Sequence, residues 1–311
     1  MIERLQQWAA ERGYHAAWGS VSIVERARRE IEARQTASEI DGYLFEHELK
    51  SIVGGENFDE GRSVLIVAMP RPAHIVHFDV DGQDFEALLP PTYFRYRATF
   101  EDIRMDLAKN GLPGARMEYL AAPLKATAAR LGLIRYGRNN ISYAKAFGSY
   151  MQLCGYLVDA SLPYLEEEES VSLLLQCENC GICAGVCPTE AISEDRVLLH
   201  AERCLTFLNE NDGDWPDWVR PQAHNCLLGC LECQRACPAN PELRIEDTGL
   251  NFSAAETSRL ISTKATTDDR AETGIRAKLA WLGQPYVESV LGRNLRALLK
   301  SKKRFQQANL P

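Results

Sequence analysis

Long apolar segments are missing from this sequence of 311 residues. Its longest apolar run, SVLIVAMP at 63–70, is far shorter than the ~20 residues that a membrane-spanning helix needs. The N-terminus lacks a basic stretch followed by an apolar core, so no secretory signal peptide is predicted. Acidic residues also outnumber basic ones, and the formal net charge is -8. These absences predict a cytoplasmic protein without a large basic surface for nucleic acid.

Cysteine, in contrast, is abundant, with 10 copies in the chain. Disulfides are rare in the cytoplasm, so this number favours metal or redox chemistry. All of the cysteines except Cys154 lie between residues 171 and 241. Cys154 itself stands in an apolar, strand-like stretch and is predicted to be a buried core thiol.

The first cysteine motif has the spacing C-x2-C-x2-C-x3-C-P and comprises Cys177, Cys180, Cys183 and Cys187. This is the bacterial ferredoxin spacing, in which three thiolates hold one cubane cluster and the fourth ligates a second cluster. Gly181 lets the loop between two of the ligands curl without a Cβ clash. A zinc site, the competing interpretation, needs two pairs of ligands in tetrahedral geometry and fits this spacing poorly. The motif therefore predicts 4Fe-4S clusters.

A second cysteine motif comprises Cys230, Cys233 and Cys237, and lacks one cysteine of the full pattern. Two clusters need eight thiolates, so the crossover between the motifs predicts two ligand sets. One set comprises Cys177, Cys180, Cys183 and Cys237, and the other comprises Cys187, Cys230, Cys233 and one further cysteine. Cys204 and Cys226 are both candidates for this eighth ligand, and spacing alone does not decide between them. Two such clusters would make the protein a one-electron conduit.

The rest of the sequence predicts an α+β fold. Short buried strands are expected at 63–70 and 156–160, and helices at 99–111 and 123–132. The stretch 77–94 contains an Asp-Gly turn and a stiff Pro-Pro pair, and we expect a loop excursion there.

Composition divides the chain into three predicted parts. An α/β domain is expected at 1–165, a ferredoxin-like domain with two 4Fe-4S clusters at 166–250, and a C-terminal helical segment that packs on the core at 251–311. An acidic run, YLEEEES, separates the first two parts and is predicted to be a solvated connector.

The cysteine motifs resemble the double-cluster part of epoxyqueuosine reductases, a family related to the cobalamin-dependent reductive dehalogenases. The resemblance rests on the stretches CENCGICAGVCPTEAI, RCLTFLN and GCLECQRACPAN, and extends from about residue 60 to about residue 250. It favours Cys204 as the eighth ligand, because in the family that cysteine follows an arginine after the first motif. It also implies that the domain at 1–165 is a nitroreductase-like, corrinoid-binding and substrate-binding domain. Such a domain would hold base-off cobalamin close to one cluster.

The segment APLKATAARLGLIRYGRNNISYAKAFGSYMQLCGYLVDASL resembles the family's cobalamin-facing segment. There a helix leads to a G-[KR]-N turn and then to a strand that starts with G-S-aromatic. The resemblance implies a set of cofactor-binding residues: Gly137, Arg138, Asn139, Asn140, Ser142, Gly148, Ser149 and Tyr150. From the residues alone, an ordinary polar turn between a helix and a strand is the alternative. No D-x-H-x-x-G motif occurs, so no lower axial histidine is predicted.

One departure from the family affects the chemistry. Epoxyqueuosine reductases carry a catalytic aspartate in D-[ST]-A-P, and the matching position in EYLAAPLK is Leu120. A leucine cannot supply a proton. Tyr93, Tyr96 and Tyr119 are therefore the candidate catalytic residues, since a tyrosine can act as a proton donor. Their alternative is a structural role at a loop-to-helix junction.

We therefore expect an iron–sulfur oxidoreductase that passes electrons through two 4Fe-4S clusters to a corrinoid, its own or a partner's, for a reductive reaction. The expected partners are a low-potential electron donor of the ferredoxin or flavodoxin type and a corrinoid protein. Nucleic acid is not expected, because the chain is acidic and lacks the long C-terminal helical repeats found in many members of the family. Two alternatives stay open: a ferredoxin-like electron carrier without corrinoid, and an epoxyqueuosine reductase that acts on tRNA.

Overall fold

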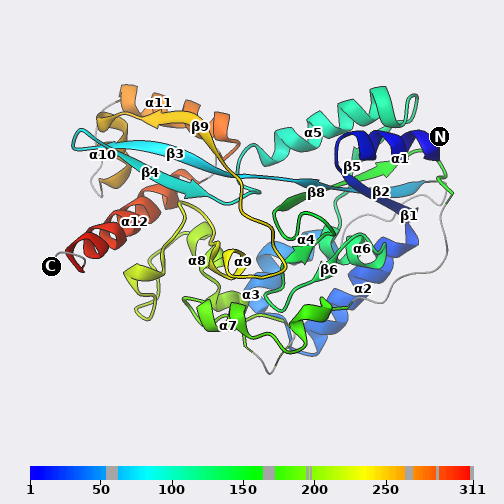
Figure 1. The fold of residues 1–311 in the computed structure, drawn as a ribbon, viewed down its shortest axis with the longest axis horizontal. Helices are drawn as coiled ribbons and strands as arrows, with labels where there is room; N and C mark the ends of the chain where they lie inside the picture. Colours follow the sequence, from blue (N-terminus) through cyan, green and yellow to red (C-terminus); the bar gives the residue numbers. More distant parts are fainter. Residues whose placement is uncertain are drawn as a thin grey trace.

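The described residues form a four-stranded and a three-stranded β-sheet that lie side by side, with cysteine-rich loops and short helices below them in the view of Figure 1, and a third sheet of two short strands. The computed structural model describes residues 1–53, 62–163, 172–193, 196, 198–262, 269–284 and 287–308. Within these ranges no helix combines the length and the apolar character that crossing a membrane requires. The predicted α+β class is confirmed. The predicted domain boundary at 165/166 and the acidic run beside it lie outside the described residues, so the division into three parts stays a prediction.

The first sheet is antiparallel, with the strand order β1-β2-β8-β5. Its strands are β1 (His15–Ser20), β2 (Ser63–Pro70), β5 (Met117–Tyr119) and β8 (Met151–Val158). β2 coincides with the strand predicted at 63–70, and β8 begins earlier than the strand predicted at 156–160. Cys154 lies in β8 and is fully buried, and burial raises the pKa of its thiol to about 12.

Helices cover both faces of this sheet (Figure 1). They are α1 (Ile2–Glu11), α2 (Ser22–Thr36), α5 (Tyr96–Asp106) and α6 (Leu124–Arg130). Successive residues of a strand point to opposite faces. Leu65 accordingly packs in the cluster that contains residues of α1 and α5, and Ile66 packs in the cluster that contains residues of α2 and α6. Burial on both sides explains why β2 is apolar from Val64 to Met69.

The second sheet joins an early part of the chain to a late one. Its strands are β3 (Ala73–Val80), β4 (Gln83–Leu89) and β9 (Ile245–Phe252), with β3 in the centre. β3 and β4 form an antiparallel hairpin, and β9 pairs with β3 in parallel. The residues of the turn, Asp81 and Gly82, have φ angles of 54° and 79°. Two positive φ angles are typical of a two-residue hairpin turn, so the loop excursion expected at 77–94 is wrong over residues 77–89.

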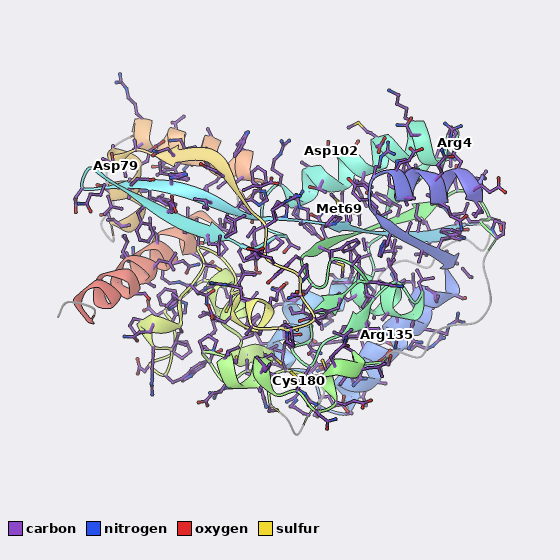
Figure 2. The ribbon with its side chains drawn as sticks, in the orientation of Figure 1. Arg4, Met69, Asp79, Asp102, Arg135 and Cys180 are labelled. Carbon is purple, nitrogen blue, oxygen red and sulfur yellow. The ribbon has the colours of Figure 1, made fainter. Side chains whose placement is uncertain are left out.

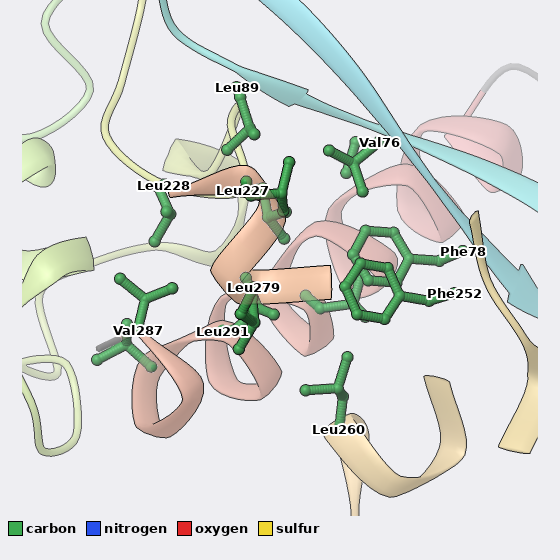
Figure 3. Packing of buried hydrophobic residues seen from close by; sticks show 14 of the residues in the cluster. Val76, Phe78, Leu89, Leu227, Leu228, Phe252, Leu260, Leu279, Val287 and Leu291 are labelled. Carbon is green, nitrogen blue, oxygen red and sulfur yellow. The ribbon is translucent and has the colours of Figure 1, made fainter. Parts of the chain in front are cut away.

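The last helices pack on this second sheet. They are α10 (Ala254–Ile261), α11 (Asp269–Leu282) and α12 (Glu288–Ala308). In their core, shown in Figure 3, the rings of Phe78 and Phe252 are stacked with centroids 4.8 Å apart and an interplanar angle of 8°. Leu227 and Leu228 from the cysteine-rich region enter the same core. The cysteine-rich region is therefore anchored to the second sheet by apolar side chains.

The cysteine-rich region itself consists of loops and very short helices. These are η3 (Leu175–Cys177), α7 (Ile182–Val186), η4 (Ala201–Arg203), α8 (Leu205–Glu210), η5 (Pro221–Ala223) and α9 (Glu232–Arg235). The remaining short elements are α3 (Gly42–Leu44), η1 (Phe45–Leu49), α4 (Lys50–Val53), η2 (Leu107–Gly111), β6 (Arg135–Tyr136) and β7 (Ser142–Tyr143). η2 continues α5 to the end of the helix that was predicted at 99–111.

Candidate functional site

Around Cys183, the thiols of both cysteine motifs come together. Burial raises the pKa of the Cys183 thiol, and the neighbouring thiols of Cys177, Cys180 and Cys237 raise it further. Cys177, Cys180 and Cys183 belong to the first motif, and Cys237 belongs to the second. This neighbourhood contains the four residues of the first predicted ligand set.

A second group of thiols surrounds Cys233. Its pKa is raised by burial and then by the nearby thiols of Cys230, Cys204 and Cys187. Cys187 comes from the first motif, so this group also combines residues of both motifs. It contains the three firmly predicted members of the second ligand set together with Cys204.

Cys226, the other candidate for the eighth ligand, lies in a different environment. It is almost fully buried among apolar residues, packed with Ala73 and Leu231. Its Sγ donates a hydrogen bond to Oδ1 of Asn225 at 3.1 Å. The same Asn225 donates through Nδ2 to the Sγ of Cys230 at 3.2 Å. Cys226 thus lies behind the second thiol group, in the hydrophobic core.

The segment 137–150, in which cofactor-binding residues were predicted, holds the cysteine loops in place. Arg138 donates a hydrogen bond to the carbonyl oxygen of Cys177 at 3.0 Å. Ser149 donates through Oγ to Oε1 of Gln234 at 3.0 Å, and Nδ2 of Asn240 donates to the same Oγ at 2.8 Å. These contacts tie the segment to the loops of both cysteine motifs.

The glycines of this segment are close to protein atoms. At Gly148, with a φ angle of 57°, an added Cβ would collide with the side chain of Asn240. At Gly137 it would lie 2.5 Å from atoms of Asn139 and Tyr143. Nδ2 of Asn139 donates to the Tyr143 hydroxyl at 3.0 Å. Both glycines therefore lack a side chain because other parts of the protein pack directly against their backbone.

A large cavity lies beside the second thiol group. Its volume is about 1110 Å³. Its wall is formed by parts of α2, α3, η1, α6 and α8, by the loop before α5 and by the loops that carry the cysteines. The cysteines that line it are Cys187, Cys204, Cys230 and Cys233. The second thiol group thus faces the cavity, whereas the first group is not part of its wall.

Some of the predicted site residues line this cavity and others do not. Those at the wall are Tyr93, Tyr96, Asn139, Asn140 and Ser149. Those that are not part of the wall are Tyr119, Gly137, Arg138, Ser142, Gly148 and Tyr150. Tyr119 lies on the outer surface, half exposed, where its hydroxyl donates to Glu101 of α5. Leu120 is buried in the core between the first sheet and α6, so it does not reach the cavity either.

Glu210 and Lys125 are among the ionisable residues at the wall that the sequence reasoning missed. Glu210, at the end of α8, accepts a hydrogen bond from the Tyr93 hydroxyl, and its pKa is raised to about 7 because the surrounding protein desolvates the carboxylate. Lys125 donates through Nζ to the carbonyl oxygen of Asn140 at 3.2 Å, and desolvation lowers its pKa. Glu210 and Tyr93 are 117 positions apart, and no spacing rule connects such residues.

Comparison with known proteins gives a consistent result for the cysteine region. Residues 176–240 match the family model described as a 4Fe-4S double cluster binding domain. Epoxyqueuosine reductase of Pseudomonas aeruginosa is 31% identical over 182 residues, which are 58% of this chain and 47% of that protein. Epoxyqueuosine reductase of Staphylococcus aureus is 35% identical over 122 residues, 39% of this chain and 30% of that protein. The alignments therefore span less than half the length of these relatives.

Solved structures resemble the fold over nearly the whole chain. A structure of epoxyqueuosine reductase from Bacillus subtilis has a TM-score of 0.67 at 18% identity and covers 96% of this chain and 81% of that one. A structure of epoxyqueuosine reductase with a tRNA-Tyr epoxyqueuosine-modified stem loop has a TM-score of 0.61 at 17% identity and covers 96% and 80%. At these identities the likeness shows a shared fold.

These findings correct two expectations from the sequence. The expected main function, electron delivery to a corrinoid, is wrong, because the relatives are named as reductases of epoxyqueuosine. The expectation that nucleic acid is not a partner is also wrong, because a protein of this fold has been solved with a modified tRNA stem loop. The acidic net charge misled this reasoning, since nucleic-acid recognition depends on the local distribution of charge and not on the total.

Proposed function

We propose that this chain, which resembles epoxyqueuosine reductases in fold and matches a 4Fe-4S double cluster binding domain, reduces the epoxide of a modified nucleoside in tRNA. The observation that carries this proposal is the cavity of about 1110 Å³ whose wall includes four cysteines of one ligand set. Ligand pockets usually measure roughly 300–1,000 Å³. The cavity can therefore take a ligand of nucleoside size directly beside a redox centre.

The proposed cluster ligands follow the two thiol groups. Cys177, Cys180, Cys183 and Cys237 would hold one cluster, and Cys187, Cys204, Cys230 and Cys233 the other. The spacing of both motifs and the mutual proximity of the thiols in each group support this division. When bound, each cluster accepts and passes on one electron at a time.

The positions of the two groups suggest a direction for the electrons. Cys180 lies at the outer, lower edge of the molecule in Figure 2, far from the sheets. Cys204 and Cys233 line the cavity. We infer that electrons from a one-electron reductant enter at the outer cluster and leave from the inner cluster toward the ligand.

The chemistry assigned to the site balances as a two-electron reduction. Conversion of an epoxide to an alkene breaks both bonds from carbon to oxygen, takes up two electrons and two protons, and releases the oxygen as water. The electrons come from the clusters in two successive steps. The cavity wall must position the epoxide and supply the protons.

We further propose that this cavity binds a corrinoid and that the surrounding domain is nitroreductase-like. Asn139, Asn140 and Ser149 offer amide and hydroxyl groups at the wall. No histidine is among the described residues that line it, which suits a corrinoid without an imidazole ligand from the protein. The residues present therefore fit such a group, which would supply a cobalt centre beside the bound ligand.

The experiment that tests the proposal is an activity assay on the anaerobically reconstituted chain. The protein is loaded with iron and sulfide, with and without hydroxocobalamin, and mixed with an epoxyqueuosine-modified tRNA-Tyr stem loop and dithionite. Mass spectrometry of the digested RNA should show a nucleoside that is lighter by one oxygen atom. Fully loaded protein that binds the stem loop but leaves the epoxide unchanged in both samples would contradict the proposal.

A further inference from the structure

Glu210 lies where a proton donor for the cavity is needed. α8 begins directly after Cys204 and ends at Glu210, and both residues line the cavity. With a rise of 1.5 Å per residue, their backbones are separated by about 9 Å along the helix. A ligand beside the inner thiol group therefore lies within reach of the Glu210 carboxyl group.

Tyr93 holds this carboxyl group in place. Its hydroxyl donates a hydrogen bond to Oε1 of Glu210. The Tyr93 ring packs directly on the backbone of Gly229, where an added Cβ would lie 2.7 Å from the hydroxyl oxygen. The carbonyl oxygen of Tyr93 accepts a hydrogen bond from Nε2 of Gln284 at 2.5 Å. The tyrosine is thus fixed at both ends, and Glu210 is fixed by the tyrosine.

The surroundings of Glu210 keep a proton available near neutral pH. Desolvation by the cavity wall raises the pKa of Glu210 to about 7, the hydrogen bond from Tyr93 opposes this shift, and the carboxylate of Glu48 adds to it. From α12, Arg293 donates to the backbone oxygen of Leu208 on the same helix. The carboxyl group is nevertheless accessible from the cavity. A general acid works best when its pKa is close to the working pH.

A second tyrosine–glutamate pair on the outer surface provides an internal comparison. There the Tyr119 hydroxyl donates to Glu101 in the same way. Arg104 also contacts that carboxylate at 2.5 Å, and together these hydrogen bonds lower the pKa of Glu101 to about 2. The tyrosine contact alone therefore does not make a proton donor. The cavity wall around Glu210 makes the difference.

We propose that Glu210, positioned by Tyr93, is the catalytic acid of the reduction and takes the role of the family aspartate that Leu120 replaces. Glu210 gives its proton to the epoxide oxygen as the first bond between carbon and oxygen breaks, and becomes a carboxylate. It regains a proton from water in the cavity and gives it to the hydroxyl group, which leaves as water. The two electrons come from a one-electron reductant through the clusters. This proposal rests on the proposed function and adds the source of the protons.

The test compares Glu210→Gln with the matched control Glu101→Gln in the reconstituted, full-length chain. Iron content, binding of the epoxyqueuosine-modified stem loop and turnover with dithionite are measured for each variant. General acid catalysis contributes about 10²–10⁴-fold, so Glu210→Gln should lower turnover at least about 100-fold with unchanged iron and Kd. Glu101→Gln should keep the turnover of the wild-type chain. Lys125→Gln tests another ionisable group at the wall and should lose much less than Glu210→Gln.

Tyr93→Phe adds a readout that does not depend on the stability of the Glu210 variant. Turnover should fall as the pH rises through the pKa of Glu210, because only the protonated acid can donate. The hydrogen bond from Tyr93 lowers this pKa. Its removal should therefore move the fall in turnover to higher pH. A pH profile identical to that of the wild-type chain would overturn the positioning role.

The outcomes separate the two proposals. Turnover by the wild-type chain, with equal rates for the Glu210 and Glu101 variants, overturns Glu210 as the acid and leaves the proposed function standing. A full loss in Lys125→Gln with none in Glu210→Gln has the same meaning. A loaded wild-type chain that binds the stem loop without turnover overturns the proposed function, and this proposal with it.

Discussion

The choice between Cys204 and Cys226 as the eighth ligand can be tested with a matched pair of substitutions, Cys204→Ala and Cys226→Ala. Both replace a buried or half-buried thiol by the same small side chain. Cys204 faces the cavity beside the other inner thiols, so its loss should leave only three thiolates for the inner cluster. The expected iron content after anaerobic reconstitution falls from about eight to about four per chain.

Cys226→Ala should keep all the iron and cost only packing. The sulfur is buried in an apolar cluster, and its deletion resembles the loss of one buried methylene, which costs about 0.5–1.5 kcal/mol. The hydrogen bond from Cys226 to Oδ1 of Asn225 disappears, but this oxygen still accepts one from the backbone N–H of Leu231 at 3.1 Å. No polar atom is therefore left without a partner, and no further cost is expected.

The assay combines iron determination, the visible spectrum and thermal unfolding of both variants and the wild-type chain. The reasoning predicts half the iron for Cys204→Ala, and full iron with slightly lower stability for Cys226→Ala. If Cys226→Ala loses half the iron and Cys204→Ala retains it, the grouping of the thiols is refuted.

Two further predictions concern the second sheet. Phe252→Ala removes a fully buried ring that is stacked on Phe78, and should lower the free energy of unfolding by about 3–5 kcal/mol, which thermal or urea unfolding will measure; a loss below about 1 kcal/mol would contradict the packing. The protonated His77 ring donates hydrogen bonds to the carboxylates of Asp84 at 2.8 Å and Asp247 at 3.1 Å, and the bond to Asp84 is the main cause that raises the pKa of this imidazole. The protonated form is therefore favoured in the folded state, and its stabilisation is fully present below the ordinary histidine pKa and lost as the pH rises through the raised value. The difference in melting temperature between the wild-type chain and His77→Gln should shrink over this pH range, and a difference that grows with pH would refute the ion pairs.

Much of the fold could be predicted from local patterns. The continuous apolar run of β2 predicted a strand buried on both faces, because only such a strand lacks polar alternation. The Asp-Gly pair was misread as part of a loop, although two positive φ angles at Asp81 and Gly82 are what a tight hairpin requires. The parallel pairing of β9 with β3 joins residues about 170 positions apart, and no local pattern contains that information.

The candidate site, too, could be predicted from the sequence only in part. The cysteine motifs could be found because cluster ligands obey a fixed spacing within a short loop. The contact between Tyr93 and Glu210 could not, because it depends on how α8 sits against a loop from a distant part of the chain. Gly137 and Gly148 were predicted to bind the cofactor, and the structure fills the space beside Gly148 with Asn240. Glycine indicates a close approach, but the sequence does not identify the partner.

The most direct test of the central claim is a single-turnover experiment with the reconstituted chain. The protein is reduced with dithionite, freed of excess reductant and mixed with the epoxyqueuosine-modified stem loop under anaerobic conditions. The account predicts that the reduced clusters are reoxidised as the deoxygenated nucleoside forms, with two reducing equivalents consumed for each molecule of product. Clusters that stay reduced in the presence of bound stem loop, with the epoxide intact, would contradict it.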